Sequence, residues 1–176
     1  MRHRTAAASI AAAVLLGLTA SSASAYPSSV SNHYNVDTTY GRCTIDVAAS
    51  ANPALVALGT LTGIESVSCA SLSITPYRIY LSGGFSGTSL DPLNVLDSGE
   101  PDRICEWQKA CYWSRSEGLF PPGDHSVKHG VDIDVAPGAG AATYLSYPAG
   151  CRVSANDKGL LLCDFTQWVT MPAPAP

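Results

Sequence analysis

Apolar and polar residues alternate with a period of two in several stretches of the chain, which is typical of half-buried β-strands. The clearest stretch is residues 125–135, where Val131 and Ile133 alternate with Asp132 and Asp134. The same alternation, in weaker form, predicts further strands at residues 42–49, 63–72 and 75–83. Because the period is two and not 3.6, the pattern predicts an all-β protein.

Clusters of Gly, Pro, Ser and Asp separate these stretches and mark turns. Several short strands joined by turns predict a single domain at residues 42–170, folded as an antiparallel two-sheet sandwich of immunoglobulin-like type. Residues 26–41 are polar and turn-rich, so we expect an N-terminal arm, and residues 171–176 form a Pro/Ala tail. Only residues 52–61 and 102–110 offer room for a turn or two of helix.

The first 25 residues have the pattern of a secretory signal peptide. Arg2 and Arg4 precede an apolar run at residues 10–20 that is too short to span a bilayer, and small residues occupy positions 23–25. Cleavage after Ala25 removes 25 of 176 residues and leaves 151, with eight basic and fourteen acidic side chains and a net charge of −6. We therefore expect an exported monomer without a membrane span, and no nucleic-acid partner, because no basic patch is available for phosphates.

All six cysteines lie in the exported part of the chain, and an even number in an oxidising compartment predicts three disulfides. Fifteen pairings are formally open. A turn sequence at residues 156–159 lies midway between Cys151 and Cys163, so a hairpin there places these two cysteines opposite each other. The spacings favour pairing of nearest neighbours, namely Cys43 with Cys69, Cys105 with Cys111, and Cys151 with Cys163.

The short ring closed by Cys105 and Cys111 contains or adjoins three aromatic residues, Trp107, Tyr112 and Trp113. Aromatic side chains on a rigid loop suit a binding tip, because they give large contact area at low entropy cost. The alternative is that one or two of these rings fill the core of the sandwich. A clipped loop also suits a protease inhibitor, since preorganisation lowers the cost of binding.

Ionisable residues suggest a hydrolase as a further alternative. Glu100, Asp102 and Glu106 form an acidic cluster, and paired carboxylates are what a glycosidase needs. His125 and His129 lie on one face of a predicted strand, but about 13 Å apart along it, which is too far for both to bind one ion.

Carboxylates near the end of the clearest strand suggest a calcium site. Asp132 and Asp134 share a face of that strand, and Asp124 or Asp164 would have to supply further oxygens. The sequence lacks the D-x-D-x-D-G loop of a dedicated calcium site, and its cysteine spacings fit neither zinc nor a redox motif. We therefore predict no metal, no cofactor and no catalytic residue.

The signal peptide, the Ala/Gly/Thr/Ser-rich composition, the alternating strands and the locally paired cysteines resemble small secreted proteins of high-GC Gram-positive bacteria with immunoglobulin-like sandwich folds. Neocarzinostatin-type apoproteins are similar in combining such a sandwich with short cysteine-closed loops. This chain has six cysteines where that family has four, and its cysteine loops differ in sequence, so chromophore binding is not inferred. The resemblance implies an extracellular binding or structural module whose partner is a protein or a polysaccharide.

Overall fold

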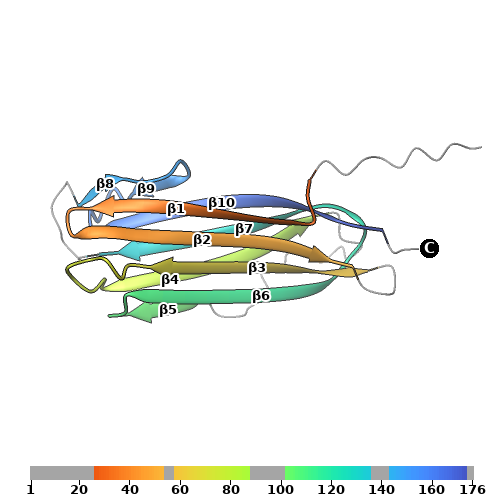
Figure 1. Ribbon diagram of the computed structural model, residues 1–176, viewed down its shortest axis with the longest axis horizontal. Coiled ribbons are helices and arrows are strands. Elements are labelled where there is room, and N and C mark those ends of the chain that lie inside the picture. Colours follow the sequence, from red (N-terminus) through yellow and green to blue (C-terminus); the bar gives the residue numbers. More distant parts are fainter. Residues whose placement is uncertain (1–25, 54–57, 88–101, 136–142, 174–176) are drawn as a thin grey trace, which may run out of the picture.

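The computed structural model describes residues 26–53, 58–87, 102–135 and 143–173, and all regular structure in these ranges is β-strand. The strands form two antiparallel five-stranded sheets that run along the long axis of the molecule (Figure 1). Sheet A has the order β6 (Ala110–Phe120), β3 (Gly59–Ser68), β2 (Gly41–Asn52), β1 (Ser29–Thr38) and β8 (Tyr144–Ser146). Sheet B has the order β5 (Arg103–Glu106), β4 (Arg78–Gly87), β7 (Gly123–Asp134), β10 (Leu160–Met171) and β9 (Cys151–Val153).

The predicted all-β two-sheet sandwich is therefore confirmed. Its immunoglobulin-like identity stays a prediction, since β1, β2 and β3 follow one another within sheet A, whereas an immunoglobulin chain changes sheets after its second strand. Because the described residues form only strands, they include no helix long and apolar enough to cross a bilayer.

Two segments differ from the sequence-based expectation. Residues 26–41 do not form an arm, because β1 pairs with β2 through ten consecutive residue pairs and places Val36 in the core. Polar residues predominate in this segment, so the alternation of apolar and polar residues was too weak to predict a strand. Residues 102–110, considered for a helix, instead form the short edge strand β5 and a turn. In the other candidate helix, residues 52–61, strand β3 begins at Gly59, and residues 54–57 lie outside the described part.

The three predicted disulfides are present and have two different roles. Cys43–Cys69 joins β2 to the residue directly after β3 in sheet A, and Cys151–Cys163 lies in register across the hairpin of β9 and β10 in sheet B. Cys105–Cys111 instead joins β5, an edge of sheet B, to β6, an edge of sheet A. This bridge therefore ties the two layers together along one side of the sandwich.

The apolar core consists of two clusters that lie one after the other along the strands, and polar side chains separate them. On β7, His129 lies between Val131 of the first cluster and Val127 of the second. Gln167 holds the equivalent place on β10 and Glu65 on β3, and all three side chains are buried. The interior therefore contains a polar layer that needs its own hydrogen bonds, because unpaired polar groups are costly there.

Candidate functional site

The predicted aromatic tip is only partly present on the surface. Trp107 and Tyr112 are 65% and 60% exposed, but Trp113 is only 7% exposed and belongs to the core, so its assignment to a binding tip is wrong. The reason is the alternation of β6, which turns Cys111 and Trp113 inward and Tyr112 outward. The same period-two pattern applied to residues 110–117 would have shown it.

Trp113 packs directly on the backbone of Gly83 in the facing sheet. A methyl group at Gly83 would lie 2.4 Å from Cη2 of Trp113 and 3.2 Å from Oε1 of Glu65, so the indole fits only because that residue has no side chain. The neighbouring Gly84 points to the outer face of sheet B, where a methyl group would meet no atom within 4 Å.

We expect Gly83→Ala to lower the free energy of unfolding by about 1–3 kcal/mol, because it overpacks the core. Gly84→Ala is the matched control and should change it by less than about 0.5 kcal/mol. Urea unfolding followed by tryptophan fluorescence measures both values. Equal stability of the two variants would show that the contact between Gly83 and Trp113 is not restrictive.

The turn inside the Cys105–Cys111 ring is fixed at several points. Trp107 has a left-handed backbone (φ 55°), donates its N–H to the Tyr77 carbonyl at 3.0 Å, and meets the Tyr77 ring edge-on at 5.2 Å between centroids. The Lys109 ammonium donates to the Leu72 carbonyl at 2.5 Å. A tight turn of this kind does not present the extended backbone that a substrate-like inhibitor loop requires, so the geometry does not favour the inhibitor alternative.

Of the ionisable residues considered for a hydrolase, the four that the structure describes do not converge on one cleft. The His125 ring is buried, where its Nε2 lies 2.8 Å from the Pro121 carbonyl, while Glu106 lies at the exposed end of β5. Glu100 is outside the described residues. Asp102 and His129 both border one hollow on sheet B, but both imidazole nitrogens of His129 are engaged inside the core.

The residues considered for calcium also fail to form a metal site. Asp134 is buried, whereas Asp132 lies on the outer face of sheet B and faces both Arg78 and Asp164. Asp124 accepts a hydrogen bond from Thr170 at 2.5 Å. Within the described ranges, no group of three or more His, Cys, Asp and Glu side chains has an arrangement that would hold a metal ion.

The outer face of sheet B has a hollow of about 360 Å³, which we call the sheet B hollow. The backbone of Gly83, Gly84 and Gly130 on β4 and β7 contributes to its floor, and the space above the floor is open at Gly84, whereas Gly83 faces Trp113 in the core and the Ser82 side chain lies over Gly130. Glycine inside a strand weakens the strand and often marks a place where a ligand approaches the backbone closely. Gly84, in the middle of a strand, is the signal in the sequence that could have pointed to this site.

Polar side chains of both charges surround the floor. The Tyr80 hydroxyl donates to the Asp102 carboxylate on one side, and Lys128 stands directly across from Gly84. On the far side Asp164 is held by Arg152 at 2.8 Å, an exposed ion pair. The rim therefore offers an aromatic ring, an ammonium donor and carboxylate acceptors around an open floor, which is a surface suited to a ligand rich in hydroxyl groups.

The polar layer of the core lies directly beneath this floor. His129 Nδ1 is 3.1 Å from Oε1 of Glu65, and His129 Nε2 is 3.1 Å from Oε1 of Gln167. The amide nitrogen of Gln167 donates to Asn32 Oδ1 and to the Val47 carbonyl. Because the Gln167 amide nitrogen donates to Asn32 and Val47, the Gln167 oxygen accepts a hydrogen bond from His129 Nε2–H. Nδ1 of His129 therefore carries no proton and accepts a hydrogen bond from the protonated carboxyl of Glu65.

The protonation states of Glu65 and His129 agree with a hydrogen bond donated by Glu65 to His129. Burial raises the pKa of the Glu65 carboxyl to about 9, with the Ser82 backbone acting in the opposite sense, so this group is a neutral acid at pH 7. Burial also lowers the pKa of His129 to about 4, with the Gln167 hydrogen bond opposing, so the imidazole is neutral. The pair is thus a neutral acid donating to a neutral imidazole, and it avoids the cost of two buried charges.

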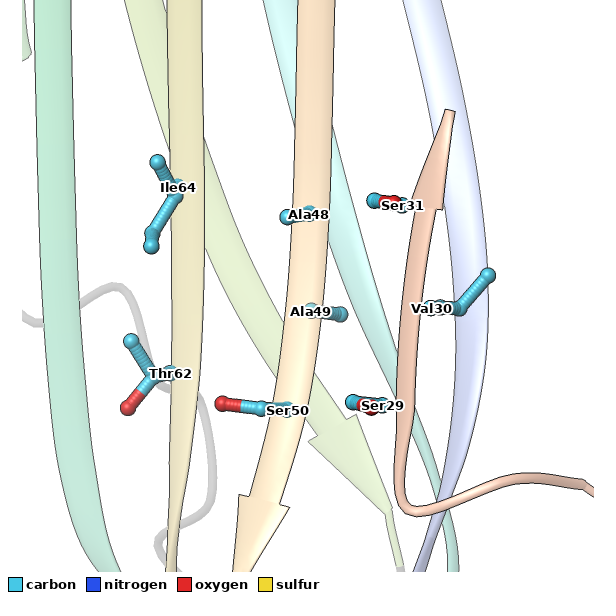
Figure 2. A pocket seen from close by; sticks show the side chains of 8 residues that line it. All are labelled: Ser29, Val30, Ser31, Ala48, Ala49, Ser50, Thr62 and Ile64. Carbon is cyan, nitrogen blue, oxygen red and sulfur yellow. The ribbon is translucent and has the colours of Figure 1, made fainter. Parts of the chain in front are cut away.

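A second hollow, of about 250 Å³, lies on the outer face of sheet A (Figure 2). Small side chains surround it: Ser29, Ser31 and Ser50 with Ala48, bordered by Thr62 and Ile64 (Figure 2). Its lining has neither a charged nor an aromatic side chain. It therefore has fewer groups that could orient a ligand than the sheet B hollow has.

The fold and its bridges define an all-β antiparallel sandwich stabilised by three disulfides, with a polar hollow on one outer face. The chain matches no protein-family model, no curated protein and no solved structure.

Proposed function

We propose that the protein is an exported, non-catalytic binding module that holds a saccharide in the sheet B hollow. The observation that carries this proposal is the open floor of the hollow at Gly84, bordered by Tyr80 and Lys128. A sugar presents an apolar C–H face to an aromatic ring and hydroxyl groups to charged donors and acceptors, and the rim supplies both. The three disulfides support export, since such bridges persist in oxidising compartments.

A hydrolase is a weaker candidate because the segments that carry the two carboxylates of the hollow lie far apart in sheet B. Asp102 and Asp164 stand on opposite sides of β4 and β7, which is three strand spacings, or about 14 Å at the backbone. Retaining glycosidases separate their two carboxyl groups by about 5–5.5 Å and inverting enzymes by about 6.5–9.5 Å. This separation of the strands that carry Asp102 and Asp164 supports the proposal of binding over that of cleavage.

Filling the hollow should abolish binding without harming the fold. We expect Gly84→Leu to weaken saccharide binding at least tenfold, because its side chain would project over the floor into space that is now open. Gly118→Leu is the matched control, since a side chain there also meets no atom within 4 Å but lies on β6 of the other sheet. Lys128→Ala should weaken binding by roughly tenfold, the loss of one charged hydrogen bond of about 1.5 kcal/mol.

The measurement is retention of the secreted protein on chitin, cellulose and isolated cell-wall polysaccharide, followed by titration calorimetry with soluble fragments of whichever is bound. Thermal melts of each variant control for folding. Binding by Gly84→Leu at the wild-type level would place the ligand elsewhere, and absence of binding to all three polysaccharides would contradict the proposed function.

A further inference from the structure

We infer that the saccharide is an extended polymer of several sugar units, which leaves the sheet B hollow and continues over the outer face of sheet B to Trp168. This inference rests on the proposed function. It concerns the length of the ligand and a second contact surface for it, beyond the hollow itself.

The first observation is that Trp168 faces the same side of sheet B as the hollow. Asp164 and Thr166 on β10 line the hollow, and Trp168 follows two residues after Thr166, so the period of the strand places all three on one face. The indole is 45% exposed. A large aromatic ring on the solvent side of a strand is therefore available beside the hollow.

The second observation is that the indole is held in one orientation. The Tyr26 ring stacks on it with 5.6 Å between centroids and 22° between planes. Backbone hydrogen bonds fix the segment that carries this ring, since Thr170 N–H donates to the Pro27 carbonyl at 3.0 Å and Ala51 N–H donates to the Ser28 carbonyl at 2.7 Å. A fixed ring loses little entropy when a ligand packs against it.

The third observation is the distance between the two aromatic side chains on this face. Tyr80 is level with Leu162 of β10 through Asp132, so Trp168 lies six residues farther along the sheet and two strands across. Strand geometry converts this offset to about 22 Å between backbones. That length exceeds a single sugar ring and requires a ligand with several units.

The surface between the two rings is open enough for such a ligand. The outward positions between the levels of Tyr80 and Trp168 are Ser82 and Gly84 on β4, Gly130 and Lys128 on β7, and Asp164 and Thr166 on β10. Lys128 is the one long side chain among these six residues. An extended peptide is the other linear ligand to consider, but peptides usually pair with a free strand edge and not with the face of a sheet. The face of sheet B therefore favours a polysaccharide.

The test compares short and long ligands by titration calorimetry on the mature chain. The probes are dimers and hexamers of β-1,4-linked N-acetylglucosamine and of β-1,4-linked glucose. We expect a hexamer to bind at least tenfold more tightly than the corresponding dimer. Trp168→Ala should remove this advantage and leave dimer binding unchanged, and Trp168→Phe should keep part of it.

Two controls separate this inference from the proposed function. Tyr112→Ala removes a more exposed ring from sheet A and should affect neither probe, while Gly84→Leu should weaken binding of both at least tenfold. If dimer and hexamer bind equally, or if Trp168→Ala leaves hexamer affinity unchanged, the inference is wrong although binding in the hollow stands. If neither length of either sugar binds, the proposed function is contradicted, and the inference with it.

Discussion

Raising the pH from 6.5 to 9 is expected to lower the free energy of unfolding by about 3 kcal/mol, because Glu65 is held as a neutral acid in the core. In the unfolded chain this carboxyl has its ordinary pKa of 4.5, so it is ionised throughout that range, whereas in the folded protein its pKa is about 9. The folded state therefore binds one more proton than the unfolded state, and its stability falls by about 1.4 kcal/mol for each pH unit.

The histidine of the same pair acts in the opposite direction at lower pH. His129 has a pKa of about 4 in the folded protein and an ordinary value of 6.5, so below 6.5 the unfolded state binds the additional proton. The effect of His129 makes the free energy of unfolding rise with pH between about 4 and 6.5. Between about pH 4.5 and 6.5 this rise cancels the fall caused by Glu65. The net profile should be a plateau from about pH 4.5 to 6.5, followed by a decline.

Glu65→Gln isolates the cause of the decline. Its amide has nearly the shape of the neutral acid and can donate to His129 Nδ1, but it does not titrate. The measurement is urea unfolding followed by tryptophan fluorescence at pH 5 to 9. The variant should lose little stability between pH 6.5 and 9, and Glu106→Gln on the exposed β5 should behave as wild type. A wild-type protein equally stable at pH 6.5 and 9 would show that Glu65 ionises normally.

Reduction of the three disulfides is expected to unfold the protein at room temperature. Bridges with sequence separations of 6, 12 and 26 residues remove chain entropy from the unfolded state. The loop-entropy relation gives about 2.4, 2.9 and 3.6 kcal/mol, or about 9 kcal/mol if the three add. A domain of this size has a total stability of about 5–15 kcal/mol, so most or all of it would be lost.

Single bridges should differ in the order of their loop lengths. Replacing Cys43 and Cys69 by serine is expected to cost about 1 kcal/mol more than replacing Cys105 and Cys111. Far-ultraviolet circular dichroism with and without reductant follows the complete loss, and urea titration of the two double variants gives the difference. Retention of the β-sheet signal after full reduction, verified by mass spectrometry, would refute this expectation.

The fold could be predicted from the sequence where neighbours along the chain determine the structure. The alternation around Val131 and the turn between Cys151 and Cys163 are local features, and both correspond to real strands and a real hairpin. Strand β1 was missed because its inward side includes Asn32, whose polar side chain is stabilised by Gln167, 135 residues away in the chain. Local sequence cannot supply a partner at that distance.

The candidate site was hidden for the same reason. Glu65 and His129 lie 64 residues apart and meet only because sheets A and B face each other. Tyr80 and Lys128 likewise belong to strands that become neighbours through the topology. Gly84 and Gly130 can be seen in the sequence, but their place in the hollow depends on the pairing of β4 with β7. This pairing brings Gly84 opposite Lys128 and Gly130 opposite Ser82.

The bridge between Cys105 and Cys111 has a consequence for how the molecule recovers after denaturation. When heat or urea separates the layers, this covalent link still keeps β5 and β6 within a few ångströms of each other. The edges of the two sheets are therefore already held together on that side before refolding begins. Refolding does not have to pay the chain entropy of closing this contact a second time. At the opposite margin, where β8 and β9 are the outermost strands, the disulfide Cys151–Cys163 joins β9 to β10 within sheet B, and the four residues between β8 and β9 are the covalent link between the layers.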